Sequence, residues 1–110
     1  MIHQGDIYLA NLSPTKGHEQ SGFRPVVVVQ KNVLNKHLST VIVAPVTKNL
    51  KAKDRETTFF LPKKISSLSV DSVCLLFQIR TIDKSRLKKK IATLSDHDFL
   101  KIKEQLDSLF

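Results

Sequence analysis

The feature that most constrains this chain is a series of short runs of strand-forming residues, each bounded by proline, glycine or charged residues. Runs of this length, with turn signals between them, are typical of a small and strongly curved antiparallel sheet. Strands are expected at residues 7–12, 26–29, 40–47, 57–61, 72–79 and 89–93. Pro25 is expected just before its strand, because proline lacks the N–H that a sheet interior requires. The predicted fold class is mainly β, with a partly open barrel.

One amphipathic helix is expected to end the chain. Ser95 is suited to be its N-cap, and Asp98, three residues on, carries a negative charge near the positive end of the helix dipole. Apolar residues follow at helical spacing, at Phe99, Ile102, Leu106, Leu109 and Phe110. Between the strands, residues 32–39 are interpreted as a polar connection and residues 48–56 as an exposed, charged loop or hairpin arm.

Length and charge narrow the possible functions. With 110 residues, of which 41% are hydrophobic, the chain is predicted to form a single domain spanning residues 1–110. Its 18 Lys and Arg outnumber its 10 Asp and Glu, and the formal charge of +8 favours an anionic partner such as nucleic acid. Charge alone does not decide this, since many basic domains bind no nucleic acid specifically.

The single cysteine and the N-terminal residues indicate where the protein works. Cys74 lies in an apolar run and cannot form an internal disulfide, which fits a reducing cytosol; we interpret it as a buried, inert thiol. The chain begins without a cationic segment followed by an apolar one, and no apolar stretch approaches the roughly 20 residues that span a bilayer. A soluble, cytoplasmic protein with no membrane partner is predicted.

Seven short motifs, all different, follow one another along the chain. They are Gly5-Asp6-Ile7-Tyr8, Ser13-Pro14, Gly17-His18-Glu19-Gln20, Gly22, Arg24-Pro25-Val26, Pro45-Val46-Thr47 and Gln78-Ile79-Arg80-Thr81-Ile82-Asp83. This series closely resembles the MazF/PemK family of toxin endoribonucleases. The resemblance covers nearly the whole chain and weakens only between about residues 48 and 72. One position departs from the family, because Phe77 stands where an acidic residue is usual.

The resemblance implies a fold, an activity and partners. It sharpens the barrel to an SH3-like one of the CcdB/PemK type, whereas the strand pattern alone fits an OB-type barrel equally well. It implies the toxin of a type II toxin-antitoxin pair, a homodimer that cuts single-stranded RNA at specific sequences, independently of the ribosome, by 2′-hydroxyl attack. It also implies no metal or other cofactor, and a cognate antitoxin whose acidic segment covers a basic groove.

Three residues are candidates for catalysis. Arg24 keeps its charge at any working pH, and its planar fork matches phosphate oxygens. Thr47 ends an apolar strand, where a threonine usually only caps the backbone. It is a catalytic candidate because the resemblance pairs a threonine at this position with Arg24. His18 lies near Arg24 in sequence, and histidine ordinarily titrates near pH 6.5, which suits proton transfer. The PemK/Kid branch of the family has histidine at this place.

A second group is predicted to bind RNA. Glu19 and Gln20 belong to the same segment as His18, although a structural role is the more common one for such residues. Phe23 is the aromatic residue placed to stack on a base, although burial is the commoner fate of phenylalanine. Gln78 and Arg80 alternate with Ile79 and are expected to share one face of a strand, where the family contacts RNA.

The sequence indicates no metal site and leaves two alternative functions open. The spacing of His3, His37 and His97 indicates no metal site, and one cysteine adds none. A noncatalytic inhibitor of DNA gyrase is the first alternative, because CcdB toxins share this fold; the combination of Arg24 and Pro25 with Thr47 favours the nuclease. A catalytically inactive RNA-binding module is the second, for which Phe77 is the hint.

Overall fold

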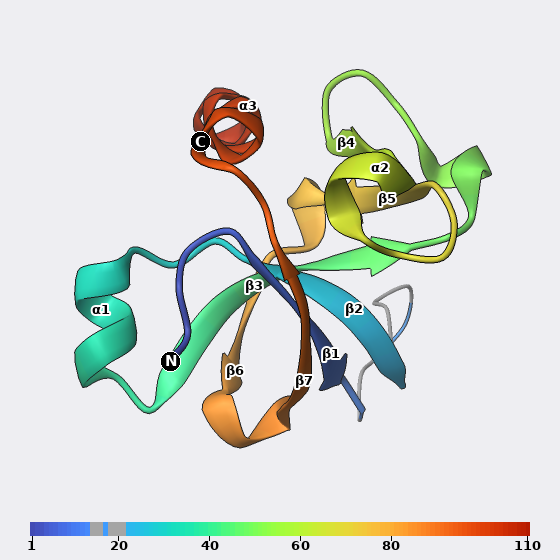
Figure 1. Ribbon diagram of the computed structural model, residues 1–110. Helices are drawn as coiled ribbons and strands as arrows, with labels where there is room; N and C mark the ends of the chain where they lie inside the picture. Colours follow the sequence, from blue (N-terminus) through green and yellow to red (C-terminus); the bar gives the residue numbers. More distant parts are fainter. Residues whose placement is uncertain (14–16, 18–21) are drawn as a thin grey trace.

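The computed structural model describes residues 1–13, 17 and 22–110, which form a seven-stranded antiparallel sheet with a helix across one part of it (Figure 1). Six strands follow the spatial order β4-β5-β3-β2-β1-β7, and β6 pairs with β3 beside this path. The strands are β1 Asp6–Asn11, β2 Phe23–Val28, β3 Thr40–Thr47, β4 Thr58–Leu61, β5 Ser72–Leu75, β6 Arg80–Asp83 and β7 Leu87–Thr93. The helices are α1 Asn32–His37, α2 Lys63–Ser66 and α3 Asp96–Leu109, and the 3-10 turns are η1 Leu50–Ala52, η2 Leu76–Gln78 and η3 Lys84–Arg86.

Strand β3 belongs to both halves of the sheet. On one edge it pairs with β2, from Val26 opposite Pro45 to Val28 opposite Val43. On its other edge it pairs first with β6 and then with β5, which lie end to end along it. The curved half formed by β6, β3, β2, β1 and β7 is therefore joined through β3 to the small half formed by β3, β5 and β4.

Pro45 explains why two strands share one edge of β3. The carbonyl of Ile42 accepts a hydrogen bond from the Val29 N–H at 3.0 Å, on the β2 side. Because alternate residues of a strand point their backbone groups to the same edge, the nitrogen of Pro45 faces the other edge, where it has no N–H to donate. The ladder on that edge breaks between Val43, opposite Arg80, and Val46, opposite Cys74.

The strand predicted over residues 72–79 is therefore confirmed only for Ser72–Leu75 and is wrong beyond it. The chain leaves β5 at Leu75, makes the 3-10 turn η2, and begins the new strand β6 at Arg80. The turn takes up the residues that have no ladder partner beside Pro45. Gln78, which ends η2, accordingly does not share a strand face with Arg80, contrary to the prediction.

Two further predictions need correction. Pro25 lies inside β2, opposite Leu9 of β1, rather than just before the strand. It precedes the first pair between β2 and β3, so β2 is paired on one side only at this point, where proline is tolerated. The polar connection at residues 32–39 contains α1, which is held by hydrogen bonds from the Asn35 side-chain amide to the Gln30 carbonyl (3.0 Å) and from the Gln30 amide to Asn35 Oδ1 (2.9 Å).

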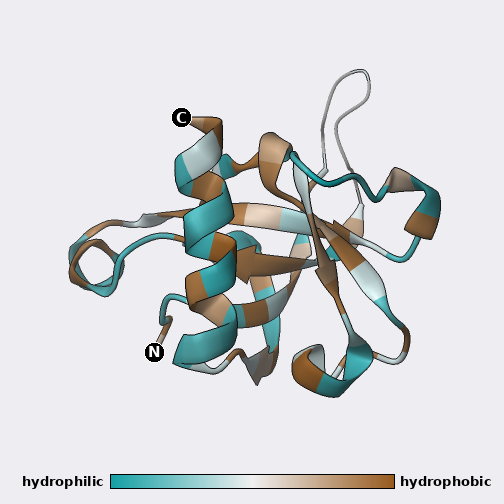
Figure 2. Ribbon diagram, turned by 90° about the horizontal axis from the view of Figure 1, so that it is seen from above, coloured by the Kyte–Doolittle hydropathy of each residue, from teal (hydrophilic) through white to brown (hydrophobic). Residues whose placement is uncertain are grey.

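Two apolar clusters lie on opposite faces of the curved sheet. The barrel interior holds one of them, whose members include Ala10, Leu12, Val26, Val28, Val41 and Val43. The other cluster lies between the sheet and α3 and includes Val27, Val46, Cys74, Phe99 and Ile102. Along α3, hydrophobic and hydrophilic residues alternate in the manner of an amphipathic helix (Figure 2).

The predicted start of α3 is confirmed, and its predicted apolar face is confirmed except at Phe110. Ser95 Oγ accepts a hydrogen bond from the Asp98 N–H at 3.1 Å, and Phe99 and Ile102 are buried. Phe110 is 87% exposed, so it does not belong to the apolar face. Cys74 is buried, as predicted, and loss of water around its thiol raises the pKa to about 12, which keeps the sulfur protonated and unreactive at neutral pH.

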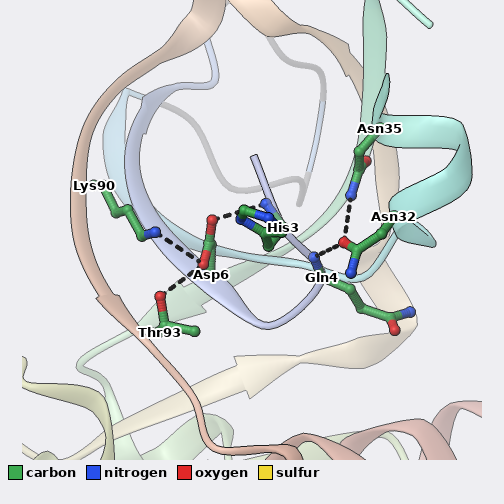
Figure 3. Close-up of polar contacts among 7 residues, drawn as sticks. All are labelled: His3, Gln4, Asp6, Asn32, Asn35, Lys90 and Thr93. Carbon is green, nitrogen blue, oxygen red and sulfur yellow. Dashed lines mark hydrogen bonds and ion pairs between the residues drawn. The ribbon is translucent and has the colours of Figure 1, made fainter. Parts of the chain in front are cut away.

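A fully buried carboxylate fastens the first strand to the last (Figure 3). Asp6 accepts hydrogen bonds from the His3 backbone N–H (2.8 Å) and from the Thr93 hydroxyl (2.7 Å), and Lys90 Nζ lies 3.4 Å from it. The bond with Thr93 joins residues 87 positions apart in sequence. Asp6 therefore stabilises the β1–β7 pairing that completes the curved half of the sheet.

Replacing Asp6 by alanine leaves the Thr93 hydroxyl and the His3 N–H without their acceptor. The free energy of unfolding should fall by on the order of 3 kcal/mol. Lys90→Ala removes only a partly exposed ion pair and should cost about 1 kcal/mol or less. Urea unfolding of the two variants measures both values, and equal losses would contradict the role assigned to Asp6.

Candidate functional site

Three strand ends meet at one end of the barrel, on the right of Figure 1. These are the end of β1 at Asn11, the start of β2 at Phe23 and the end of β3 at Thr47. His18, Glu19 and Gln20, which were predicted to act here, lie outside the described residues. The geometry of the site is therefore built from the strand ends and the side chains that hold them.

The sheet register brings Arg24 and Thr47 to the same place. Arg24 is opposite Ala10 of β1, and Val26 is opposite Pro45 of β3. Continuing the β2–β3 register by two residues places Arg24 opposite Thr47, and residues opposite each other in antiparallel strands have side chains on the same face. That face is the barrel interior, so the two side chains belong to its open end.

Thr47 is 7% exposed, and its hydroxyl has a defined partner. Thr47 Oγ1 accepts a hydrogen bond from the Asn49 backbone N–H at 3.1 Å. Thr47 is thus a backbone cap, the usual role of a threonine at the end of a strand. A hydroxyl that accepts such a bond still has its own hydrogen to donate, so capping holds the oxygen in place without using up its donor.

Two arginines hold the end of β1. Arg80 Nη1 donates to the Leu12 carbonyl (3.4 Å), and Arg86 Nη1 donates to the carbonyls of Asn11 (3.2 Å) and Ser13. Guanidinium groups therefore bind the carbonyls of three successive residues. We call this arrangement the arginine clamp, formed by Arg80 and Arg86.

The arginine clamp also fixes the start of β2. The Leu12 N–H donates to the Gly22 carbonyl, and the Gly22 N–H donates to Ser13 Oγ, both at 2.9 Å. Gly22 has a φ of +77°, a backbone conformation that residues other than glycine rarely adopt. It stands two residues before Arg24. The clamp thus acts through Leu12, Ser13 and Gly22 on the position of Arg24.

Sequence reasoning missed Arg86 as a site residue. In the sequence it is one of several basic residues between positions 84 and 90. Its place is set by η3, which begins after Asp83, whose side chain accepts a hydrogen bond from the Ser85 N–H at 2.8 Å. Hydrogen bonding by Ser85, through its side chain first and its backbone N–H second, lowers the pKa of the Asp83 carboxyl. An Asp three residues before an Arg is too common a pattern to have singled it out.

The two phenylalanines of interest are both accessible. Phe23 is 64% exposed, and Phe77, on η2, is 53% exposed. Phe23 therefore does not follow the commoner fate of burial and presents an aromatic ring beside Arg24. Nothing in the packing of the barrel requires an aromatic residue at this exposed position.

The described part of the chain holds neither a cluster of metal-binding side chains nor a membrane-spanning helix. Its His, Cys, Asp and Glu residues form no group of three or more that could hold a metal ion. Within the same residues, no helix has both the length and the apolar character needed to cross a membrane.

Comparison with known proteins identifies the family. Residues 3–110 match the family model described as PemK-like, MazF-like toxin of type II toxin-antitoxin system. This chain belongs to that family. It is 47% identical over 107 residues to the Endoribonuclease MazF of Staphylococcus epidermidis, covering 97% of this chain and 89% of that protein.

Solved structures of MazF proteins share the fold. A crystal structure of MazF from Deinococcus radiodurans matches with a TM-score of 0.81 at 28% identity, covering 98% of this chain and 94% of that one. A MazE-MazF crystal structure from the same organism matches with a TM-score of 0.75 at 28% identity and the same coverage. The predicted resemblance and the predicted small barrel with a C-terminal helix are thereby confirmed.

Loss of the arginine clamp should make the backbone at the end of β1 more mobile. Arg86→Met removes the donors to Asn11 and Ser13, so the backbone of the β1 end and of Gly22 should open more often. Hydrogen exchange measured by NMR should become roughly tenfold faster at the Leu12 and Gly22 amides, since hydrogen bonds from charged groups contribute about 1.5 kcal/mol or more. Lys88→Met is the control, because within the described residues Lys88 Nζ donates to the nearby Ser85 carbonyl and not to the end of β1. Equal exchange in the two variants would contradict the clamp.

Proposed function

We propose that this toxin is a ribosome-independent, sequence-specific endoribonuclease that cuts single-stranded RNA in the cytoplasm. The observation that carries the proposal is the β2–β3 register, in which Val26 is opposite Pro45; continued by two residues, it brings Arg24 opposite Thr47. The 47% identical relative is named an endoribonuclease, which supports the same activity here. A gyrase inhibitor is not favoured, because the combination of Arg24, Pro25 and Thr47 resembles the nuclease branch.

Arg24 stabilises charge in the transition state. The 2′-hydroxyl oxygen attacks the adjacent phosphorus and loses its proton, the bond from phosphorus to the 5′ oxygen breaks, and that oxygen gains a proton. The products are a 2′,3′-cyclic phosphate and a 5′-hydroxyl. Negative charge increases on the non-bridging phosphoryl oxygens during attack, so a fixed guanidinium binds the transition state more strongly than the substrate.

Thr47 and His18 have complementary parts in this proposal. The Thr47 hydroxyl, held by the Asn49 N–H, donates its hydrogen to a phosphoryl oxygen. His18 moves a proton at the 2′ or 5′ oxygen, because histidine is the residue type that exchanges protons near neutral pH. The acidic residue usual at position 77 is not needed for this assignment, and activity is retained with Phe77.

RNA binding is assigned to Phe23, Gln78 and Arg80, and to Glu19 and Gln20, which lie outside the described residues. Phe23 offers an exposed ring for base stacking, and Glu19, Gln20 and Gln78 offer polar groups for base edges. Arg80 contributes positive charge while it holds the Leu12 carbonyl, because one guanidinium has five N–H donors. The formal charge of +8 attracts the phosphate backbone over a longer range.

The partners follow from the same surface. We assign a homodimer as the working form and an antitoxin with an acidic segment as the inhibitor. Support comes from the net positive charge of the chain, which an acidic segment complements, and from the MazE-MazF crystal structure of a family member. Bound there, the antitoxin segment competes with RNA for the same cations.

The Arg24 assignment is tested by substitution. Arg24→Ala should lower the single-turnover rate of RNA cleavage by roughly 100- to 1,000-fold, the typical effect of removing one preorganised charge-stabilising donor. Arg24→Lys should recover only part of the rate, because an ammonium lacks the planar fork. Arg55→Ala, in the exposed loop before β4, is the matched control and should cleave normally. Near-normal cleavage by a folded Arg24→Ala protein would refute the assignment.

Cleavage should need no divalent metal, since the proposed chemistry uses only the arginine, the threonine and a proton-transfer group. RNA incubated with the protein in excess EDTA should still give discrete fragments, and mass spectrometry should find cyclic phosphate at their 3′ ends. Fragments that appear only after magnesium is added, or that carry 5′-phosphate, would contradict the mechanism.

A further inference from the structure

A cavity of about 240 Å³ lies beside Arg24, on the other face of the sheet from the barrel interior. Phe23, Pro25, Val46 and Lys48 line it. The register explains this grouping, because continuing the β2–β3 pairing places Pro25 opposite Val46 and Phe23 opposite Lys48. Arg24 stands between Phe23 and Pro25 and lines the same cavity from its edge.

Another wall of the cavity comes from the segment between α2 and β5, residues 68–70. This segment is held at both ends. The Leu68 N–H donates to Ser66 Oγ (3.1 Å), and the Ser72 hydroxyl donates to the Val70 carbonyl (3.1 Å). Asp71 in turn accepts a hydrogen bond from the Lys63 N–H at the start of α2 (2.9 Å). The wall is thus formed before any ligand binds.

We propose that this cavity is a base-specificity pocket, which takes the nucleobase next to the phosphate that is cut. The proposal rests on the proposed endoribonuclease function and names the part of the substrate that this cavity recognises. Phe23 is the stacking platform, Leu68 and Val70 form an apolar wall, and Ser69 offers a hydroxyl to a base edge. Lys48 and Arg24 bind the phosphates on either side of the base.

The shape and charge of the cavity favour a base. Its volume is below the roughly 300 to 1,000 Å³ of sites for drug-sized ligands, so it suits one planar ring system rather than a length of peptide. Among the described residues that line it, two carry positive charge and none is a carboxylate. A ring that is 64% exposed next to cations is the combination that single-stranded nucleic acid binders use.

The first test measures sequence preference. Cut sites of the parent and of three variants are mapped on a pool of RNAs with randomised sequence. Phe23→Leu and Val70→Asp should weaken the preference at one nucleotide position beside the cut by roughly tenfold and leave the other positions unchanged. Phe77→Leu, at another exposed phenylalanine, is the control and should keep every preference. Unchanged preferences in both pocket variants, with the parent cutting normally, would overturn the pocket while the proposed function stands.

The second test measures binding without cleavage. An oligonucleotide with 2-aminopurine beside a 2′-deoxy nucleotide at the cut position cannot be cleaved, and stacking on Phe23 should quench its fluorescence. Phe23→Leu should abolish the quenching and weaken binding by roughly 5- to 150-fold, whereas Phe23→Tyr should retain both, because stacking contributes about that much per base. Circular dichroism shows whether each variant is folded.

The outcomes of the second test separate the two claims. Quenching by a parent protein that cuts no RNA would support the pocket and refute the proposed activity. Quenching that is the same in the parent and in Phe23→Leu would overturn the pocket. So would a Phe23→Leu protein that binds the oligonucleotide normally and loses affinity only for an acidic antitoxin peptide, since the cavity would then be a peptide site.

Discussion

A missing N–H on β3 is the constraint on which the arrangement of this molecule depends. Pro45 faces the edge of β3 where β5 and β6 meet, and the ladder cannot continue across it. The chain therefore makes η2 at this point, and β5 is free to pair with the last two residues of β3 and with β4. One strand thus belongs to a curved sheet at its start and to a second, smaller sheet at its end.

This division also positions the candidate site. Because β3 continues past the end of its pairing with β2, Thr47 lies beyond the last β2–β3 pair, beside the start of β2 where Arg24 stands. Pairing of Thr47 with Val73 fixes the backbone there, and the arginine clamp fixes the neighbouring end of β1. The side chains assigned to chemistry are therefore carried on strand ends held from both sides, which is the rigidity that a preorganised charge requires.

The net positive charge of the chain has more than one use. Arg80 and Arg86 donate to backbone carbonyls, Lys84 donates to the Asn35 carbonyl at the end region of α1, and Lys90 lies beside the buried Asp6. Charge counted from the sequence therefore overstates the number of cations available to an anionic partner. Position decides which of them act on RNA, and the strand-end cations Arg24 and Lys48 line the cavity beside Phe23.

Much of the fold was predictable, because it depends on local signals. Residues close together in the sequence were enough to predict the strand-forming runs, the Ser95 cap and the helical spacing of Phe99 and Ile102. The break at η2 was not predictable, since it depends on which edge the nitrogen of Pro45 faces. Helix α1 was missed because hydrogen bonds between Gln30 and Asn35 hold it, and its sequence has no apolar residues at helical spacing.

In the site, the family motifs pointed to Arg24 and Thr47. The role of Arg86 could not be predicted, because it depends on hydrogen bonds to Asn11 and Ser13, which are 75 and 73 positions away in the sequence.

The central claim is that Arg24 and Thr47 act on the same phosphate, and a double-mutant cycle tests it most directly. Single-turnover cleavage rates are measured for the parent, Arg24→Ala, Thr47→Val and the double variant on one RNA. If both side chains stabilise the same charge, the double variant should lose less rate than the product of the two single losses, with a coupling energy of about 1 kcal/mol or more. Losses that multiply in full would show that the two residues act independently and would contradict the account.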